Sequence, residues 1–315
     1  MVVVAVAGGT GGLGKTVVEQ LRLHGSHHKC YVLGRKAPQH PTFDLAPFLE
    51  VDYGEVESLT KILEDHDIDT IISTINLETN AGSEAQLNLI AAASSSRVTR
   101  RIIPSEFVSV IDEDNSNSGP GIGGWIANAR ALKKSQLEYT RISIGFFSDY
   151  WGLPHIKTNL RPFHWFLDID KGVAAIPGTG DEKFTVTYSK DLALIIVKLL
   201  DIGERWPERL CLSGSDISLN ELVAHAEKIR GSKMSVVYDP VEKLDRGDVT
   251  LLWHPEDVSE DQFKPLFVGL CQLILAGDCL LPKDSDWLAA KFPDLQLTTA
   301  EEILDRAWKG RESAI

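Results

Sequence analysis

Short apolar runs alternate with longer amphipathic segments along residues 1–152 of the chain. The runs are rich in Val and Ile and have the length of strands, whereas the segments between them repeat apolar residues at a spacing near 3.6, which is typical of helices. The expected strands are residues 2–7, Cys30–Leu33, Glu50–Val51, Thr70–Thr74, Arg101–Pro104 and Tyr139–Ile144, and the expected helices are Gly14–His24, Val56–His66, Ala81–Ser95 and Ile126–Gln136. Strands that alternate with helices predict an α/β fold with a doubly wound parallel sheet.

The pattern changes after Gly152, where prolines and glycines interrupt aromatic-rich segments. Further helices are expected at Ser189–Leu200, Leu219–Arg230 and Glu260–Ala276, and short strands near Leu210–Ser213 and Ser235–Tyr238. We therefore expect residues 1–152 to form the parallel-sheet domain and residues 153–315 a smaller α/β region that binds substrate, with the strand near 210–213 returning to the main sheet. The polar, glycine-rich stretch Asp112–Gly124 is expected to be an exposed loop near the site.

Composition narrows the class of protein. The 315 residues are 43% hydrophobic and 24% charged, which is ordinary for a globular protein, and the formal charge is −13. Such a charge argues against direct nucleic-acid binding, which needs clustered cations.

No apolar run approaches the roughly 20 residues that cross a bilayer, and the opening residues lack the features of a signal peptide. The cysteines are scattered (Cys30, Cys211, Cys271 and Cys279), so we expect reduced thiols in a cytoplasmic protein.

A glycine loop follows the first expected strand and precedes the first expected helix. Its residues are Gly8-Gly9-Thr10-Gly11-Gly12-Leu13-Gly14, with glycines spaced G-x-x-G-x-x-G. Glycine permits the tight turn, the approach of the backbone to a pyrophosphate and the packing of helix on strand, while the helix N-terminus offers N–H groups to phosphates. In this context the motif predicts an NAD(P)-binding Rossmann fold, with Gly8, Thr10, Gly11, Gly12, Leu13 and Gly14 at the cofactor. The alternative is a glycine-rich turn that binds no ligand.

The end of the second expected strand indicates which dinucleotide is bound. About 20 residues beyond the loop, NAD-specific folds carry an Asp or Glu that accepts from the ribose hydroxyl. Here the strand ends Val32-Leu33-Gly34-Arg35-Lys36, without a carboxylate. Because a guanidinium can grip a phosphate with two hydrogen bonds, Arg35 is expected to bind the 2′-phosphate of NADP(H), with Lys36 assisting. A solvated basic turn is the alternative.

Three further strand ends are expected to border the cofactor. Asp52 could meet the adenine edge, and the segment with Thr74 and Asn76 should run beside the pyrophosphate and the nicotinamide ribose. Ser105 and Phe107 should lie near the nicotinamide. For each of these residues, ordinary packing at a strand end is an equally good interpretation.

Several of these segments together resemble the NmrA-like, isoflavone reductase-like family of atypical short-chain dehydrogenases, and its fungal members in particular. The matching motifs are Val6-Ala7-Gly8-Gly9-Thr10-Gly11, Ile72-Ser73-Thr74-Ile75, Ile103-Pro104-Ser105-Glu106-Phe107, Leu137-Glu138-Tyr139-Thr140, Gly145-Phe146-Phe147 and Ala307-Trp308-Lys309-Gly310. The resemblance spans nearly the whole chain. It implies an NADP-binding Rossmann domain, and either reduction of aromatic secondary metabolites or a regulatory role in which the protein senses the dinucleotide and binds a transcription factor.

The chain departs from the reductases of this family at their catalytic lysine. Aligned without gaps on Leu137-Glu138-Tyr139-Thr140, that position falls on Trp125, and residues 115–132 contain no Lys. Lys133 and Lys134 follow two turns later, where solvated charges are the ordinary expectation. The Tyr-x-x-x-Lys pair of other short-chain dehydrogenases is also missing.

Other proton donors are available after the sixth expected strand. This segment carries Tyr150, His155 and Lys157 as candidate general acids, and its rings Phe147 and Trp151, together with Trp125, are expected to bind a flat substrate. In the alternative interpretation Phe147 and Trp151 belong to the core and His155 is a structural histidine.

No metal site is expected, because His27-His28 and Asp65-His66-Asp67 have the pattern of surface turns. A G-x-S-x-G nucleophile elbow is also missing. The leading hypothesis is an NADPH-dependent reductase of an aromatic or polyketide-like secondary metabolite. A dinucleotide-sensing regulator that acts through a protein partner, and a non-redox isomerase or cyclase, stay open.

Overall fold

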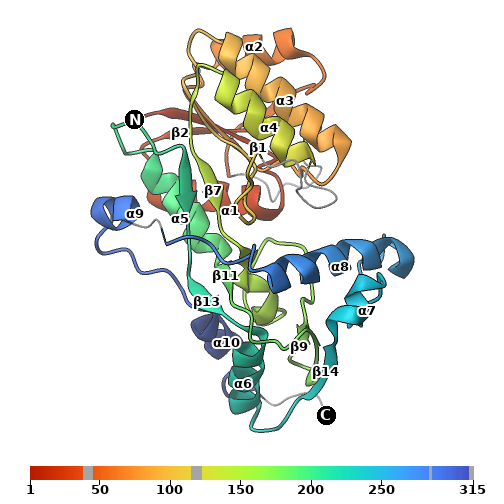
Figure 1. The fold of residues 1–315 in the computed structure, drawn as a ribbon. Coiled ribbons are helices and arrows are strands. Elements are labelled where there is room, and N and C mark those ends of the chain that lie inside the picture. The colour runs from red at the N-terminus through yellow and green to blue at the C-terminus, as the bar shows by residue number, and fades with distance from the viewer. Residues whose placement is uncertain (38–44, 115–122, 284–285, 312–315) are drawn as a thin grey trace. The chain divides into compact units, whose positions relative to one another are not determined.

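The computed structural model describes residues 1–37, 45–114, 123–283 and 286–311. Its contacts divide the chain into two compact units (Figure 1). The first unit comprises residues 1–107, 111–143 and 190–210, and the second comprises residues 108–110, 144–189 and 211 onward. The chain therefore leaves the first unit after Ser143 and re-enters it at Lys190. That residues 153–315 bind substrate stays a prediction.

The first unit is built on a six-stranded parallel sheet. Its strands are β1 (Val3–Ala7), β2 (Lys29–Gly34), β3 (Phe48–Glu50), β4 (Thr70–Ser73), β5 (Arg101–Ile103) and β6 (Glu138–Tyr139), in the order β3-β2-β1-β4-β5-β6. The doubly wound parallel sheet predicted from the sequence is confirmed. The strand order reverses between β1 and β4, and in open α/β sheets ligands bind beyond the carboxyl ends of the strands at such a switch point.

Helices cover both faces of this sheet. They are α1 (Gly12–His24), α2 (Val56–Asp65), α3 (Asn80–Ser95) and α4 (Gly123–Lys134). Helix α5 (Ser189–Leu199) also belongs to this unit from Lys190 onward. Helices α2, α3 and α4 pack side by side on one face, and α1 lies on the other (Figure 1). Residues Val4–Ala7 of β1 are fully buried, as expected for a central parallel strand covered on both faces.

The sixth expected strand differs from the prediction, because it is divided at Thr140. Its first part is β6, and its second part, β7 (Arg141–Ser143), pairs with β12 (Arg209–Cys211) in a separate two-stranded sheet. The Arg141 amide donates to Glu208 O at 2.9 Å, so the backbone beyond Thr140 is hydrogen-bonded to the segment around Glu208 and not to the main sheet. The strand expected near 210–213 therefore pairs with β7 and not, as predicted from the sequence, with the main sheet.

Arg141 also forms the centre of a buried ionic cluster in the first unit. Only 4% of Arg141 is exposed. Its guanidinium donates to Glu106 Oε2 at 2.7 Å, to Glu113 Oε2 at 2.6 Å and to Ile111 O at 2.7 Å. A buried charge is tolerated only when it is paired and hydrogen-bonded in this way. The cluster thus fixes the segment that follows β5.

The second unit is a smaller α/β assembly with an aromatic core. One sheet has the order β13-β11-β8 and another the order β14-β10-β9. The elements are β8 (Phe146–Phe147), η1 (Ser148–Gly152), β9 (Leu167–Asp168), β10 (Val173–Pro177), β11 (Phe184–Thr187), β13 (Ser215–Ile217), α6 (Leu219–Arg230), β14 (Ser235–Asp239), α7 (Val241–Asp245), α8 (Glu260–Ala276), α9 (Asp286–Lys291) and α10 (Ala300–Trp308). Capping boxes at Ser218, Ser259 and Thr299 explain where α6, α8 and α10 begin. Within the described ranges, no helix has the length and apolarity needed to cross a membrane.

Acid should weaken the buried ionic cluster through Glu113. Desolvation opposes the ionisation of Glu113, but hydrogen bonds from Arg141 and the charges of Arg141 and Arg209 outweigh it and lower its pKa from 4.5 to about 2. Because the folded-state pKa is depressed, ionised Glu113 stabilises the fold above pH 4.5, and this contribution is lost as the pH falls toward 2. We expect Glu113→Gln to lower the free energy of unfolding by about 1.5–3 kcal/mol at pH 7 and by less at pH 3.

Urea unfolding at both pH values measures this difference. Glu208→Gln is the control, because the Glu208 side chain is 65% exposed. An equal deficit for Glu113→Gln at pH 7 and pH 3 would contradict the assignment.

Candidate functional site

The glycine loop joins β1 to α1 through a very close packing contact. Gly8 has a φ of +81°, a conformation that favours glycine, and a Cβ there would lie 2.8 Å from Thr74 Oγ1. A Cβ on Gly14 would lie 2.4 Å from both Gly8 O and Thr74 Oγ1. The Thr74 hydroxyl itself donates to Ala7 O at 2.7 Å. Strand, loop, helix and the end of β4 therefore meet where only glycine fits.

The other side of the loop is open. Apart from the adjacent residues and the backbone of α1 itself, no heavy atom of the described residues lies within 4 Å of a Cβ added to Gly11 or Gly12. Gly11 is the N-cap of α1, and within the described chain no side chain caps this helix end. Its first turn also carries no acidic residue, Thr10 is exposed, and Leu13 is buried beneath the turn. Free N–H groups and unobstructed space at a helix N-terminus fit the phosphates of a dinucleotide.

Arg35 and Lys36 are exposed just beyond the end of β2. Burial raises the pKa of Tyr53, and the positive charge of nearby Arg35 acts in the opposite direction. The Tyr53 hydroxyl donates to Leu33 O at 3.3 Å, which holds this ring beside the same strand end. Two cations at this edge of the sheet can meet an anionic group of a ligand.

The side chains expected beside the cofactor on neighbouring strands are partly engaged in local hydrogen bonds. Asp52 Oδ1 accepts from the Gly54 amide at 2.8 Å. Asn76 Oδ1 accepts from the Glu78 amide at 2.9 Å. The Ser105 amide donates to Gln86 Oε1 at 2.9 Å, and Phe107 is 9% exposed. These bonds shape the strand ends, while contact of the four side chains with a cofactor stays a prediction.

A cavity of about 390 Å³ lies in the first unit, between the end of β4 and the N-termini of α3 and α4. It is lined by Leu77, Glu78, Thr79, Asn80, Ser83, Glu84, Gly123 and Gly124. Trp125 is half-buried in the first turn of α4. The sequence gives no signal for these polar lining residues, because no motif links the start of α3 to the start of α4. Positions 115–122 of the expected loop lie outside the described residues.

Lys133 and Lys134 fall in the last turn of α4. Lys133 is 56% exposed and forms ion pairs with Glu113 at 3.5 Å and with Asp114 at 3.3 Å. Lys133 therefore has the surface role expected of it.

The three candidate acids in the second unit have different surroundings. Tyr150 is half-buried among the rings of Phe147, Phe163 and Trp165, at centroid distances of 5.8–6.4 Å. His155 packs edge-on against Trp308 at 4.5 Å, and Lys157 is exposed.

Trp151 belongs to the core of the second unit. It is 3% exposed, and its Nε1 donates to Trp165 O at 3.1 Å. This burial matches the core interpretation of Trp151, and its contact with a substrate stays a prediction.

A second cavity, of about 210 Å³, lies within the second unit. Its lining combines aromatic rings with charged groups: Tyr150, Trp151, Leu153, Pro154, His164, Leu167, Asp168, Ile169, Asp170, Lys171 and Trp308. Asp168 and Lys171 form an ion pair at 2.9 Å, and despite desolvation the hydrogen bonds from Lys171 lower the pKa of Asp168. Within the described chain, Tyr150 lines this cavity, whereas His155 and Lys157 do not.

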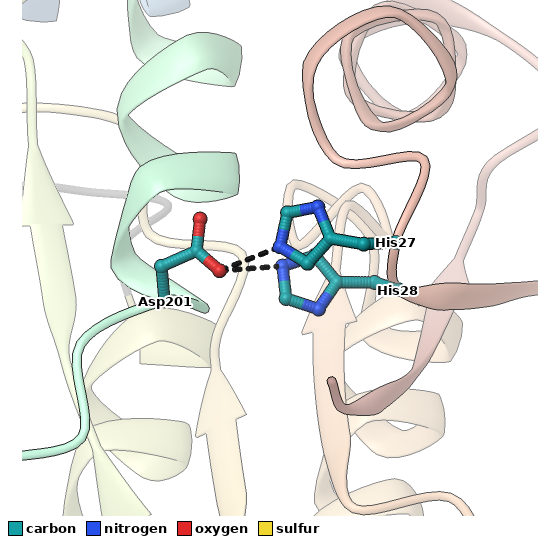
Figure 2. Close-up of side chains that lie close together, drawn as sticks. All are labelled: His27, His28 and Asp201. Carbon is teal, nitrogen blue, oxygen red and sulfur yellow. Dashed lines mark hydrogen bonds and ion pairs between the residues drawn. The ribbon is translucent and has the colours of Figure 1, made fainter.

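The prediction that His27-His28 forms a surface turn is wrong for His28. His28 is 7% exposed, because its ring turns inward toward Asp201, as Figure 2 shows. Asp201 follows α5 and lies 174 residues from His27 in the chain, so the sequence pattern could not reveal this contact.

Comparison with known proteins identifies the family. The model of the NmrA-like family matches residues 2–261. The chain belongs to the NmrA-like family. It is 32% identical to oxidoreductase swnN of Metarhizium robertsii over an alignment of 343 positions, gaps included, which covers 99% of both chains. It is also 32% identical to oxidoreductase BOA1 of Botryotinia fuckeliana over 234 residues, covering 74% of this chain and 77% of that protein.

A solved structure shares the fold. The leucoanthocyanidin reductase–NADPH complex of Vitis vinifera aligns with a TM-score of 0.72 at 21% identity, covering 97% of this NmrA-like chain and 99% of the reductase. The family resemblance inferred from the sequence motifs is confirmed by the family model and by the relatives at 32% identity.

The packing of the glycine loop predicts unequal losses of stability for two similar substitutions. Gly14→Ala should lower the free energy of unfolding by about 1–3 kcal/mol, because its Cβ meets backbone atoms. Gly11→Ala should lower it by about 0.5–1 kcal/mol at most, because Gly11 has φ −152° and no clash with other elements, so that only the poorer N-cap preference of Ala remains. Urea unfolding of both variants tests this, and equal destabilisation would refute the proposed packing.

Proposed function

We propose that this NmrA-like protein is an NADP(H)-dependent oxidoreductase that acts on an aromatic or polyketide-like secondary metabolite. The observation that carries the proposal is the open N-terminus of α1, flanked by Gly11 and Gly12. Phosphate groups fit such a site because the amides and the helix dipole favour negative charge. Two relatives at 32% identity are oxidoreductases by name, which supports the redox class.

Arg35 supports the phosphorylated cofactor over NAD(H). Its guanidinium is exposed at the end of β2, where the 2′-phosphate of the adenosine ribose is expected, and Lys36 adds a second positive charge. The Vitis vinifera reductase of the same fold is a complex with NADPH.

Further contacts with the cofactor follow from the strand ends. The amides near Gly12 and Leu13 would bind the pyrophosphate, and Asp52 would border the adenine. Asn76 would face the nicotinamide ribose, and Ser105 and Phe107 would border the nicotinamide ring. When bound, NADPH supplies a hydride, while the protein orients the substrate and provides a proton.

Tyr150 is the proton donor that the second unit supports best. A reduction that adds hydride to the carbon of a C=O group also needs a proton at the oxygen, and a phenol hydroxyl can donate it. Tyr150 lines the 210 Å³ cavity, while His155 packs on Trp308 and Lys157 points to solvent. Phe147 beside Tyr150 would offer its ring to a flat substrate, and Trp125 at the family's lysine position is a separate candidate for this role.

Regulation without turnover is the second candidate function. Trp125 at the position of the catalytic lysine favours it, because a sensor needs the dinucleotide but no proton donor. Such a sensor would act through a protein partner, since the charge of −13 disfavours DNA. Trp125 in place of the catalytic lysine equally favours a non-redox isomerase or cyclase on the same scaffold.

Cofactor selectivity tests the role of Arg35. We expect Arg35→Ala to raise the Kd for NADPH by about 10–100-fold, equivalent to roughly 1.5–3 kcal/mol for a charged hydrogen-bonding contact, and to change the Kd for NADH little. Calorimetric titration of both dinucleotides measures this. Lys29→Ala is a control, because Lys29 is an exposed cation at the other end of the same strand. Equal weakening of NADPH and NADH binding would contradict the assignment.

Turnover separates the candidate functions. NADPH absorbance is followed with a panel of quinones and enones, and we expect oxidation with at least one of them. Tyr150→Phe should then reduce kcat by about 100-fold or more with little change in NADPH affinity, because it removes only the hydroxyl. Tight NADPH binding without oxidation by any compound of the panel would favour the regulatory or non-redox function.

A further inference from the structure

We infer that His27, His28 and Asp201 form a binding site for a divalent transition metal ion of the zinc type, separate from the proposed cofactor site. Figure 2 shows both imidazole rings turned toward one carboxylate oxygen of Asp201. All three residues belong to the first unit. His27 and His28 lie in the turn between α1 and β2, and Asp201 lies two residues beyond the end of α5.

The spacing of the three potential ligand atoms suits a small cation. Asp201 Oδ1 lies 2.7 Å from His27 Nε2 and 3.3 Å from His28 Nε2. Each residue offers one ligand atom, and these atoms all lie within 4.8 Å of one another. Tetrahedral zinc with bonds near 2.0–2.1 Å separates its ligand atoms by about 3.3 Å. The separations between the three ligand atoms therefore need to change by at most about 1.5 Å to reach this geometry.

Burial distinguishes this cluster from an ordinary surface group. The side chain of His28 is only 1% exposed. Among the described residues, its Nε2 makes no hydrogen bond and has only the 3.3 Å ion-pair contact with Asp201 Oδ1. A buried polar atom without a hydrogen bond is costly, and a metal ion would satisfy it. The side chains of His27 and Asp201 are 51% and 53% exposed, which leaves an entry path for the ion.

Metal binding at His28 Nε2 has one identifiable cost. His28 Nδ1 now accepts a long hydrogen bond of 3.3 Å from the Val2 amide. A neutral ring bound to metal through Nε2 carries its proton on Nδ1, so the Val2 bond is lost when the ion binds. This bond is at the weak end of the distance range, and a metal–imidazole bond replaces it.

The donor set indicates the class of ion and its role. Two imidazoles and one carboxylate suit Zn²⁺ and its neighbours, whereas Mg²⁺ and Ca²⁺ prefer all-oxygen sites. His28 directly precedes β2, whereas the glycine loop follows β1 at the opposite, carboxyl edge of the same parallel sheet. The ion would therefore tie the segment after α5 to the α1–β2 turn, and would not touch the cofactor.

Zinc titration of the full chain without an affinity tag tests the site. After treatment with a chelator and its removal, ZnCl₂ is added during calorimetry, and bound metal is measured by elemental analysis. We expect one Zn²⁺ per chain and a Tm that rises by a few degrees. Co²⁺ in place of Zn²⁺ should give the visible absorption bands of a tetrahedral ion. Absence of bound zinc would overturn the inference.

Ligand variants locate the ion. His27→Ala and Asp201→Asn should each weaken Zn²⁺ binding by at least about 10–100-fold and abolish the rise in Tm. Both side chains are half-exposed, so the fold should persist, which circular dichroism checks. His24→Ala is the matched control, because His24 is an exposed histidine at the end of α1, and it should bind zinc as the parent does. Unchanged zinc binding in both ligand variants, or equal loss in His24→Ala, would refute the site.

Discussion

The loop between β1 and α1 approaches the end of β4 so closely that neither Gly8 nor Gly14 has room for a Cβ. Thr74 fills this contact and donates its hydroxyl to Ala7 O, so the carboxyl ends of β1 and β4 are held together where the strand order reverses. The direction of α1 follows from this packing, and its uncapped N-terminus is thereby turned to open space. The proposed phosphate site depends on this packing between the glycine loop and the end of β4.

The paired charges around Arg141 impose a second constraint. Glu106 and Glu113 neutralise a guanidinium that would otherwise be unstable in the interior, and the backbone of Arg141 is bonded to the segment around Glu208. This explains why the main sheet ends at Tyr139 and a separate two-stranded sheet begins at Arg141. The same cluster fixes the turn that presents Ser105 and Phe107.

In this NmrA-like chain, the residues that bear on dinucleotide binding differ from those that bear on turnover. The glycine loop and Arg35 concern binding of a dinucleotide, and they are independent of whether a reaction follows. Trp125 bears on turnover, because the family resemblance of the sequence predicts the catalytic lysine of the reductases at this position. Tyr150, which lines a small cavity in the second unit, is the proton source that we propose in place of that lysine.

The sequence by itself determined the features that arise from local periodicity and local backbone geometry. The helices Leu219–Arg230 and Glu260–Ala276 have the predicted bounds, because apolar spacing and capping residues act within a few turns. Only the tertiary structure decided the division of the sixth strand at Thr140, the burial of His28 against Asp201 and the cavity linings. These features depend on contacts between residues far apart in the chain, such as the 174 positions between His27 and Asp201, which no local pattern encodes.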